Sequence, residues 1–123
     1  MHKFRELKVW QRAMDFVTEI YRASAKFPRP EQFGLTSQIR RAAVSIALNI
    51  AEGAGASSNA QFRQFLSYSL RSTYEAMTAL EISQRLGYCP SERTQALLDE
   101  ADEIAAMTVG LSRSLTPPST PNC

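Results

Sequence analysis

Histidine and cysteine are nearly absent from this sequence of 123 residues, which has one histidine and two cysteines. The histidine, His2, lies at the N-terminus, where we expect a frayed segment. The sequence therefore supplies no histidine to serve as a general base and no histidine and cysteine cluster to hold a metal. A helical RNase that requires an arginine and a histidine one turn apart is excluded for the same reason. We expect no catalytic residue, no metal site and no cofactor.

Phosphate-binding loops and carboxylate metal centres are also missing. The glycine-rich stretch EGAGA, residues 52–56, follows a helical pattern, whereas a phosphate-binding loop should follow a strand. Glu52 and Glu75 lack the Glu-x-x-His partners of di-iron bundles. The sequence therefore does not favour an enzyme.

Long apolar runs are absent as well. No segment approaches the roughly 18 uncharged apolar residues of a membrane span, and MHKFRELKVW at the start lacks the apolar core of a signal peptide. Cys89 lies at an expected turn and Cys123 is the last residue, so they do not suggest a disulfide framework. We expect a cytoplasmic protein with no membrane partner.

What the sequence does contain is apolar residues at helical spacing. Hydrophobic residues make up 44% of the chain and charged residues 21%, which is typical of one globular domain. Four segments show the spacing, and we find no period-two run that would predict a strand. The expected core positions are Leu7, Trp10, Met14, Val17 and Tyr21; then Leu35, Ile39, Ala42, Ala43, Ile46 and Ile50; then Phe62, Phe65, Leu66, Ser69, Thr73, Met77, Leu80 and Leu86; and finally Leu97, Ala101, Ile104, Thr108, Leu111 and Leu115.

Turn signals separate these segments. Pro28 and Pro30 end the first helix, Ser58 with Gln61 resembles a capping box before the third, and Ser91 is a candidate N-cap for the fourth. Four long helices joined by short loops predict an all-α fold, an up-down-up-down antiparallel four-helix bundle over residues 1–115. Residues 116–123, TPPSTPNC, are expected to form a disordered C-terminal tail.

A second, polar set of residues runs along the second helix. Its members share one helix face, because they are separated by three, four, four and three positions: Gln38, Arg41, Ser45, Asn49 and Glu52. In a hairpin that turns near Ala56, Arg41 faces Ser72 within one turn of Glu75, and Asn49 comes close to Gln64. Glu52 would accept backbone N–H groups at the start of the third helix.

Two interpretations of this polar set stay open. It could be a partly buried hydrogen-bond network with an Arg41–Glu75 ion pair, which sets how the helices align. Alternatively, the four residues Arg41, Asn49, Glu52 and Glu75 could line a pocket for a small ligand.

Charge is unevenly divided along the chain. Residues 1–63 contain ten Lys/Arg and five Asp/Glu, whereas residues 64–123 contain four and seven. The basic half could bind nucleic acid or the acidic half of another copy, or its charges could be solvated. Arg40 is the most informative candidate, since it points about 100° away from Arg41 and is expected to be free. The candidate nucleic-acid contacts are Lys3, Arg5, Lys8, Arg12, Arg22, Arg40 and Arg63.

Large aromatic side chains exceed what one helix seam can bury. An isolated bundle of this length would expose some of these rings, so we expect part of them to lie between subunits. The rings are Phe4, Trp10, Phe62, Phe65, Tyr68 and Tyr74.

Several stretches resemble a known family. FRELKVWQRAM, GLTSQIRRAAVSIALNIAEG, FRQFLSYSL with Glu75 following, and LGY at 86–88 are similar to the four-helix-bundle proteins encoded in intervening sequences of bacterial 23S ribosomal RNA. The central block carries Gln38, Ile39, Arg41, Ser45, Asn49, Glu52 and Gly53 in register with the family pattern. The sequence departs from that pattern in having Ala47 in place of a proline, Ser69 and Arg71 in place of a small pair, and no arginine near Ala56.

The resemblance implies a cytosolic bundle that assembles into a ring, with a pentamer preferred, and no established activity. A related branch, the accessory proteins of diversity-generating retroelements, works with a reverse transcriptase and RNA. Our prediction is a non-enzymatic homo-oligomer that binds RNA or DNA through its basic residues. The alternative is a ligand-binding bundle with the polar pocket described above.

Overall fold

The protein is built from helices throughout the part that the structure describes. A computed structural model describes residues 2–118, and within them there is no strand. This confirms the predicted all-α class. The tail prediction concerns residues 116–123, of which 119–123, with Cys123, lie outside the described residues. The elements are η1 Phe4–Glu6, α1 Lys8–Ser24, η2 Arg29–Glu31, α2 Leu35–Ala54, α3 Asn59–Arg85 and α4 Ser91–Ser114.

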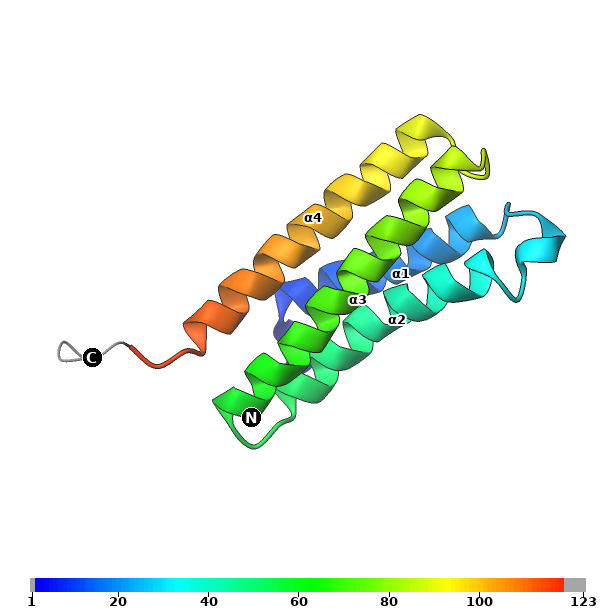
Figure 1. Cartoon of the computed structure of the whole chain (residues 1–123). Helices are drawn as coiled ribbons and strands as arrows, with labels where there is room; N and C mark the ends of the chain where they lie inside the picture. Colours follow the sequence, from blue (N-terminus) through cyan, green and yellow to red (C-terminus); the bar gives the residue numbers. More distant parts are fainter. Residues whose placement is uncertain (1, 119–123) are drawn as a thin grey trace.

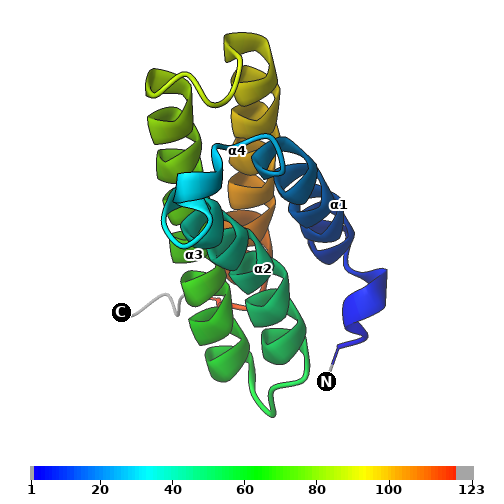
Figure 2. The same ribbon diagram turned by 90° about the vertical axis from the view of Figure 1, so that its right-hand side faces the viewer.

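The four long helices lie side by side and alternate in direction, as Figures 1 and 2 show. α2 and α3 form the most extensive pairing; α1 packs against α2 and α4, and α4 closes the bundle against α3. This packing is consistent with the predicted four-helix bundle. The largest fully buried apolar side chains are Phe16, Ile20, Ile39, Ile46, Ile50, Phe62, Leu66, Leu80 and Ile104.

The predicted core face of α1 is only partly correct, since Leu7, Trp10 and Val17 are half-buried against the core but do not form its centre. The helix buries Val9, Ala13, Phe16 and Ile20, whereas Met14 and Tyr21 of the expected stripe are 43% and 42% exposed. The reason is that α1 is apolar over two neighbouring arcs, and spacing alone does not say which one faces the bundle. The core faces expected for the other three helices are largely buried, although Leu86 is exposed.

The turns use the expected residues with local differences. Ser58 Oγ accepts from Gln61 N at 3.2 Å, as in a capping box. The Gln61 side chain, however, accepts from the backbone N–H of Ser57 and not from that of the N-cap residue Ser58. Ser91 does not cap α4; Pro90 takes that position and Ser91 Oγ accepts from Gln84.

Gly87 ends α3 in the left-handed region, with φ 78°. Its N–H donates to Gln84 O, and Tyr88 N–H donates to Ser83 O, which together form a Schellman motif. Because a side chain is strained at this φ, glycine at position 87 stops the helix cleanly and starts the connection to α4.

The N-terminal segment is held in place rather than frayed, contrary to our expectation. His2 N donates to Ala54 O at 2.8 Å, and the His2 ring lies 5.0 Å from the Phe62 ring. Figure 1 shows this end of the chain beside the α2–α3 connection. The segment from His2 through η1 therefore covers one end of the bundle.

Candidate functional site

The polar residues of α2 separate into an inner and an outer group. The inner group is a hydrogen-bond chain centred on Ser45, which accepts Asn49 Nδ2 at its carbonyl and hydroxyl oxygens, at 2.9 and 3.0 Å. From α3, Ser72 Oγ donates to Ser45 Oγ at 2.9 Å, and Ser69 Oγ donates to Ile46 O at 3.0 Å. These bonds fix how α2 and α3 align.

The alignment differs from the predicted one. Ser72 pairs with Ser45, whereas the predicted hairpin placed it opposite Arg41, about one turn away. Asn49 bonds within α2, and no bond joins it to Gln64 in the described structure. A small difference in where the α2–α3 connection turns changes which residues of the two helices face each other along their whole length.

Gly53 explains why α2 and α3 can approach so closely near their connection. A Cβ built there would lie 2.8 Å from Phe62 Cδ1 and 2.9 Å from Phe65 Cβ, closer than real Cβ contacts. Buried small residues continue this close seam, among them Ala42, Ala43, Ala76 and Ser69. The stretch 34–53, which carries the family resemblance, thus contains a glycine that close packing requires as well as polar residues.

The outer group of polar residues is solvated. Gln38, Arg41, Glu52 and Glu75 are all exposed. Within residues 2–118 Arg41 and Glu75 form no ion pair, so that prediction is wrong. Exposed charges gain little from pairing, since water solvates each of them well. Ser58, and not Glu52, caps the N-terminal end of α3 in the described structure.

Two hollows open on the outside of the α2–α3 pair. The smaller, about 410 Å³, is lined by Gln38, Arg41, Ala42, Ser45 and Glu75. Of the four residues predicted to line a ligand pocket, Arg41 and Glu75 line this hollow, and Asn49 and Glu52 do not.

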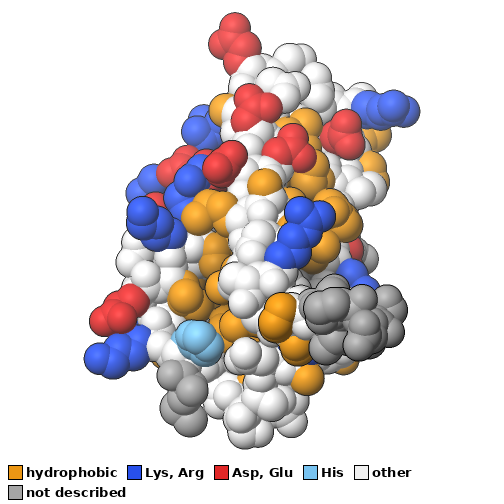
Figure 3. Space-filling view, turned by 90° about the vertical axis from the view of Figure 1, so that its left-hand side faces the viewer, with side chains coloured by type: hydrophobic (Ala, Val, Ile, Leu, Met, Phe, Trp, Pro, Cys, Tyr) orange, Lys and Arg blue, Asp and Glu red, His pale blue; other side chains and the backbone are white. Residues whose placement is uncertain are grey.

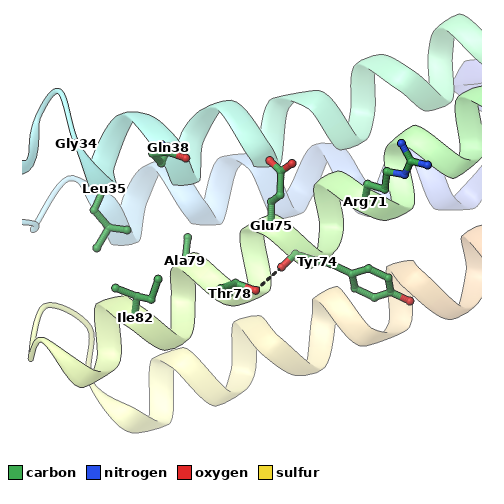
Figure 4. Close-up of a pocket in the computed structure, with 9 residues that line it drawn as sticks. All are labelled: Gly34, Leu35, Gln38, Arg71, Tyr74, Glu75, Thr78, Ala79 and Ile82. Carbon is green, nitrogen blue, oxygen red and sulfur yellow. Dashed lines mark hydrogen bonds between the residues drawn. The ribbon is translucent and has the colours of Figure 1, made fainter.

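The larger hollow is an open groove of about 840 Å³, shown in Figure 4. Leu35 and Ile82 lie at one end of it and Arg71 at the other, with the Glu75 side chain pointing from α3 toward α2. Ile82 is 44% exposed. Sequence reasoning did not select the groove, although one signal was available: Ile82 is a large apolar residue outside the core positions of α3. The lining residues are Gly34, Leu35, Gln38, Arg71, Tyr74, Glu75, Thr78, Ala79 and Ile82.

Four of the seven candidate basic residues have partners within the chain. Arg12 forms a bidentate pair with Glu100 at 2.7 and 2.9 Å, and Arg22 bonds Glu19 at 2.7 Å. Arg63 donates to Leu115 O at 2.6 Å. The fourth, Arg40, was expected to be free but donates to Ser24 Oγ and Tyr21 O and stacks 4.5 Å above the Tyr21 ring.

Lys3, Arg5 and Lys8 remain. All three are exposed near the N-terminal end of α1 and form no ion pair in the described part of the chain. Elsewhere charges of both signs mix: on the face in Figure 3, acidic and basic side chains alternate, with hydrophobic side chains between them. Lys3, Arg5 and Lys8 lie close together in the sequence, with the exposed acidic residue Glu6 between them.

The seam between α1 and α4 is held by two ion pairs, Arg12–Glu100 and Arg93–Glu19. Hydrogen bonds from Arg93 and then Arg22 lower the pKa of the Glu19 carboxyl. The hydrogen bond to Glu100 raises the pKa of Arg12. Both shifts show that the hydrogen bonds favour the charged forms, and these partly exposed pairs add to the apolar packing of the seam.

Other kinds of site find no support in the part of the chain that is described. Residues 2–118 contain no cluster of three metal-ligating side chains. None of the helices there has the length and apolarity that spanning a bilayer would take. The features that stand out are the α2–α3 groove and the exposed apolar side chains of Met14 and Tyr21 on α1.

Fold and surface together define the chain as a small antiparallel four-helix-bundle protein with exposed apolar faces. The family model described as 23S rRNA-intervening sequence protein matches residues 5–110, and the chain belongs to this family. This confirms the resemblance seen in the sequence.

A solved structure is also similar. It is the crystal structure of a protein of unknown function from the S23 ribosomal protein family of Bacteroides thetaiotaomicron VPI-5482. The two chains superpose with a TM-score of 0.77 at 25% sequence identity, over 85% of this chain and 98% of the other. No curated protein matches the sequence.

Proposed function

We propose that this chain is a non-enzymatic interaction protein that assembles with copies of itself. The observation that carries the proposal is the second apolar stripe of α1, which we define as Trp10, Met14, Val17 and Tyr21. Trp10 and Val17 are half-buried against the core, and Met14 and Tyr21 are the exposed members. The helix already buries another face, yet Met14 and Tyr21 remain more than 40% exposed. An exposed apolar stripe beside a complete core is typical of a surface that a partner covers.

The α2–α3 groove is the second contacting surface in this proposal. It lies on the opposite side of α2 from the α1 stripe, because Arg40 reaches Tyr21 of α1 while Gln38 faces α3. Two different apolar faces suit a heterologous contact, in which the stripe of one subunit enters the groove of the next. Such contacts close into a ring when the rotation permits, and the family resemblance favours a pentamer.

Mixing two variants tests this head-to-tail arrangement. Met14→Glu damages the stripe and Ile82→Glu damages the groove, and we expect each variant alone to be monomeric in sedimentation equilibrium at micromolar concentration. A mixture of the two retains one intact stripe and one intact groove, so it should form a 1:1 dimer.

The matched control is Ala106→Glu, which adds the same charge at an exposed position of α4. It should keep the oligomer of the unmodified chain. A monomeric unmodified protein at moderate salt would refute self-assembly, and a mixture that stays monomeric would refute the pairing of stripe with groove.

Nucleic-acid binding is a second proposed activity, and the cluster of Lys3, Arg5 and Lys8 favours it. Three exposed cations per subunit become a larger basic surface when a ring repeats them. Filter binding of structured RNA and single-stranded DNA should show retention that falls steeply with salt. Replacing the three residues by glutamine should abolish that retention without changing the oligomer, and salt-insensitive or absent retention would refute this part.

We also propose a reducing, cytoplasmic location. Cys89 is buried and unpaired, which suits a compartment that keeps thiols reduced. The measurement is cell fractionation with a tagged full-length chain, and recovery from an oxidising compartment would contradict the proposal.

A further inference from the structure

A pocket of about 390 Å³ lies where α1 ends and α4 begins. It shares no lining residue with the α1 stripe or the α2–α3 groove. Three cationic side chains line it, Arg22 and Lys26 from the end of α1 and Arg93 from the first turn of α4. Its lining includes no acidic residue.

Glu19 orients two of these cations from outside the pocket. Its Oε1 accepts from Arg22 Nη1 at 2.7 Å and its Oε2 from Arg93 Nη2 at 2.6 Å. Each guanidinium therefore uses one donor nitrogen on Glu19 and keeps its others for a further anion. Lys26 adds a third positive charge to the lining, and the carboxylates of Glu19 and Glu31 bond to lining residues from outside it, so the site remains net positive.

The remaining wall of the pocket is apolar and rigid. Ala23, Cys89 and Pro90 form part of it, and Cys89 is only 4% exposed. The Tyr88 ring completes the wall. Its hydroxyl donates to Glu31 Oε2 at 3.1 Å, and the centre of its ring lies 5.8 Å from that of the Phe27 ring. This surface suits the flat or apolar part of a ligand.

We propose that this pocket binds a small phosphate-bearing molecule. The phosphate contacts Arg22, Lys26 and Arg93, and a planar or apolar group lies against Tyr88 and Pro90. Arginine pairs hold phosphate oxygens through parallel N–H donors, and the volume is within the range of small-molecule sites. The site shares no lining residue with the two surfaces that we propose for self-assembly.

Calorimetric titration at low ionic strength tests the proposal with three probes: adenosine 5′-monophosphate, inorganic phosphate and adenosine. We expect the monophosphate to bind best, phosphate to bind more weakly, and adenosine not to bind. Replacing Arg22 and Lys26 by glutamine should weaken monophosphate binding at least about tenfold, because two charge-assisted contacts are lost. The control variant, Arg85→Gln with Arg113→Gln, removes the same charge at two exposed positions that do not line the pocket and should bind as the unmodified chain does.

The Cys89 thiol gives an independent readout. With Cys123 replaced by serine, the monophosphate should slow the reaction of Cys89 with a thiol reagent, and adenosine should not. The proposal is overturned if the monophosphate does not bind at millimolar concentration, if adenosine binds equally well, if the control variant weakens binding as much, or if Cys89 is not protected.

Discussion

Gly53 lies where α2 meets the aromatic side chains that begin α3, and a methyl group there would collide with two of them. The nearer contact is Phe62 Cδ1, and Phe62 is fully buried, so its ring has no open space to move into. The second contact is the Cβ of Phe65, which moves only with the backbone. Position 53 therefore requires the absence of a side chain rather than a special backbone angle.

Replacing Gly53 by alanine should destabilise the fold. The better helix propensity of alanine contributes about 1 kcal/mol, but overpacking of this kind typically costs about 1–3 kcal/mol. We expect a net loss of roughly 1–2 kcal/mol in urea unfolding. Gly110→Ala is the matched control, since nothing lies within 4 Å of a Cβ built at that helical position. It should raise stability by about 0.5–1 kcal/mol, and similar effects at both positions would contradict the close-packing explanation.

Arg40 and Arg41 show how far sequence reasoning reaches at the scale of single residues. Helical geometry predicts correctly that these neighbours point in different directions. It does not say which one meets another helix: Arg40 bonds to Ser24 and stacks on Tyr21, whereas Arg41 is solvated. That choice depends on how α1 packs on α2, which spacing within α2 does not contain.

The α2–α3 seam depends on short hydroxyl side chains that bond across it. Ser45 and Ser72 meet directly, so replacing either by alanine removes the hydrogen bond between them, and Ser45→Ala also removes the bond from Asn49 Nδ2 to Oγ. Each single variant should lose about 1 kcal/mol, and the double-mutant cycle should give a coupling of about 0.5–1 kcal/mol. Ser45 with Thr18, on α1, is the control pair and should be additive. Additive behaviour of Ser45 with Ser72 would show that the observed bond contributes nothing.

The α1–α4 seam should respond to acid through Glu19. Because the pKa of Glu19 is lower in the folded protein than in the unfolded chain, its pairs stabilise the fold above the ordinary glutamate range. That contribution, at most about 1 kcal/mol for partly exposed groups, is lost as pH falls from the ordinary glutamate range through the lower pKa of the folded state.

Thermal unfolding at several pH values checks this prediction. Glu19→Gln should be less stable than the unmodified chain at pH 7, and the difference should shrink on acidification. Glu81→Gln, at an exposed position of α3 without an ion pair in the described structure, should follow the unmodified chain. A constant difference for Glu19→Gln across the pH range would contradict the assignment.

At the level of helices, the sequence predicts the number, order and approximate ends of the four elements, because apolar spacing and turn residues act locally. Spacing predicts the whole stripe of α1 in the core, but only Trp10 and Val17 pack against it, and Met14 and Tyr21 are exposed. The side of α1 that faces the bundle depends on where Phe16 and Ile20 fit among the other three helices. The groove and the pocket at the end of α1 could not be predicted, since each combines residues from two or more elements that only the tertiary structure brings together.

For the whole molecule, the exposed stripe and the groove are costly unless a partner covers them. The single chain leaves Phe33, Leu48, Tyr74, Ile82 and Leu86 between 44% and 90% exposed, in addition to Met14 and Tyr21. Burial between subunits would remove part of this apolar surface from water, at about 25 cal/mol per Å². Folding and assembly are then linked, so the stability of each subunit depends on the concentration of the others.

This linkage predicts a thermal midpoint that rises with protein concentration. A tenfold increase in free partner is worth about 1.4 kcal/mol, which should raise the midpoint by about 3–6 °C for a chain of this size. Ile82→Glu, which leaves the core intact, should unfold at a lower temperature that does not change with concentration. Ala106→Glu should keep the concentration dependence of the unmodified chain. A midpoint of the unmodified protein that stays constant over a hundredfold range of concentration would show that the single bundle is stable without partners, and that its exposed apolar faces need another explanation.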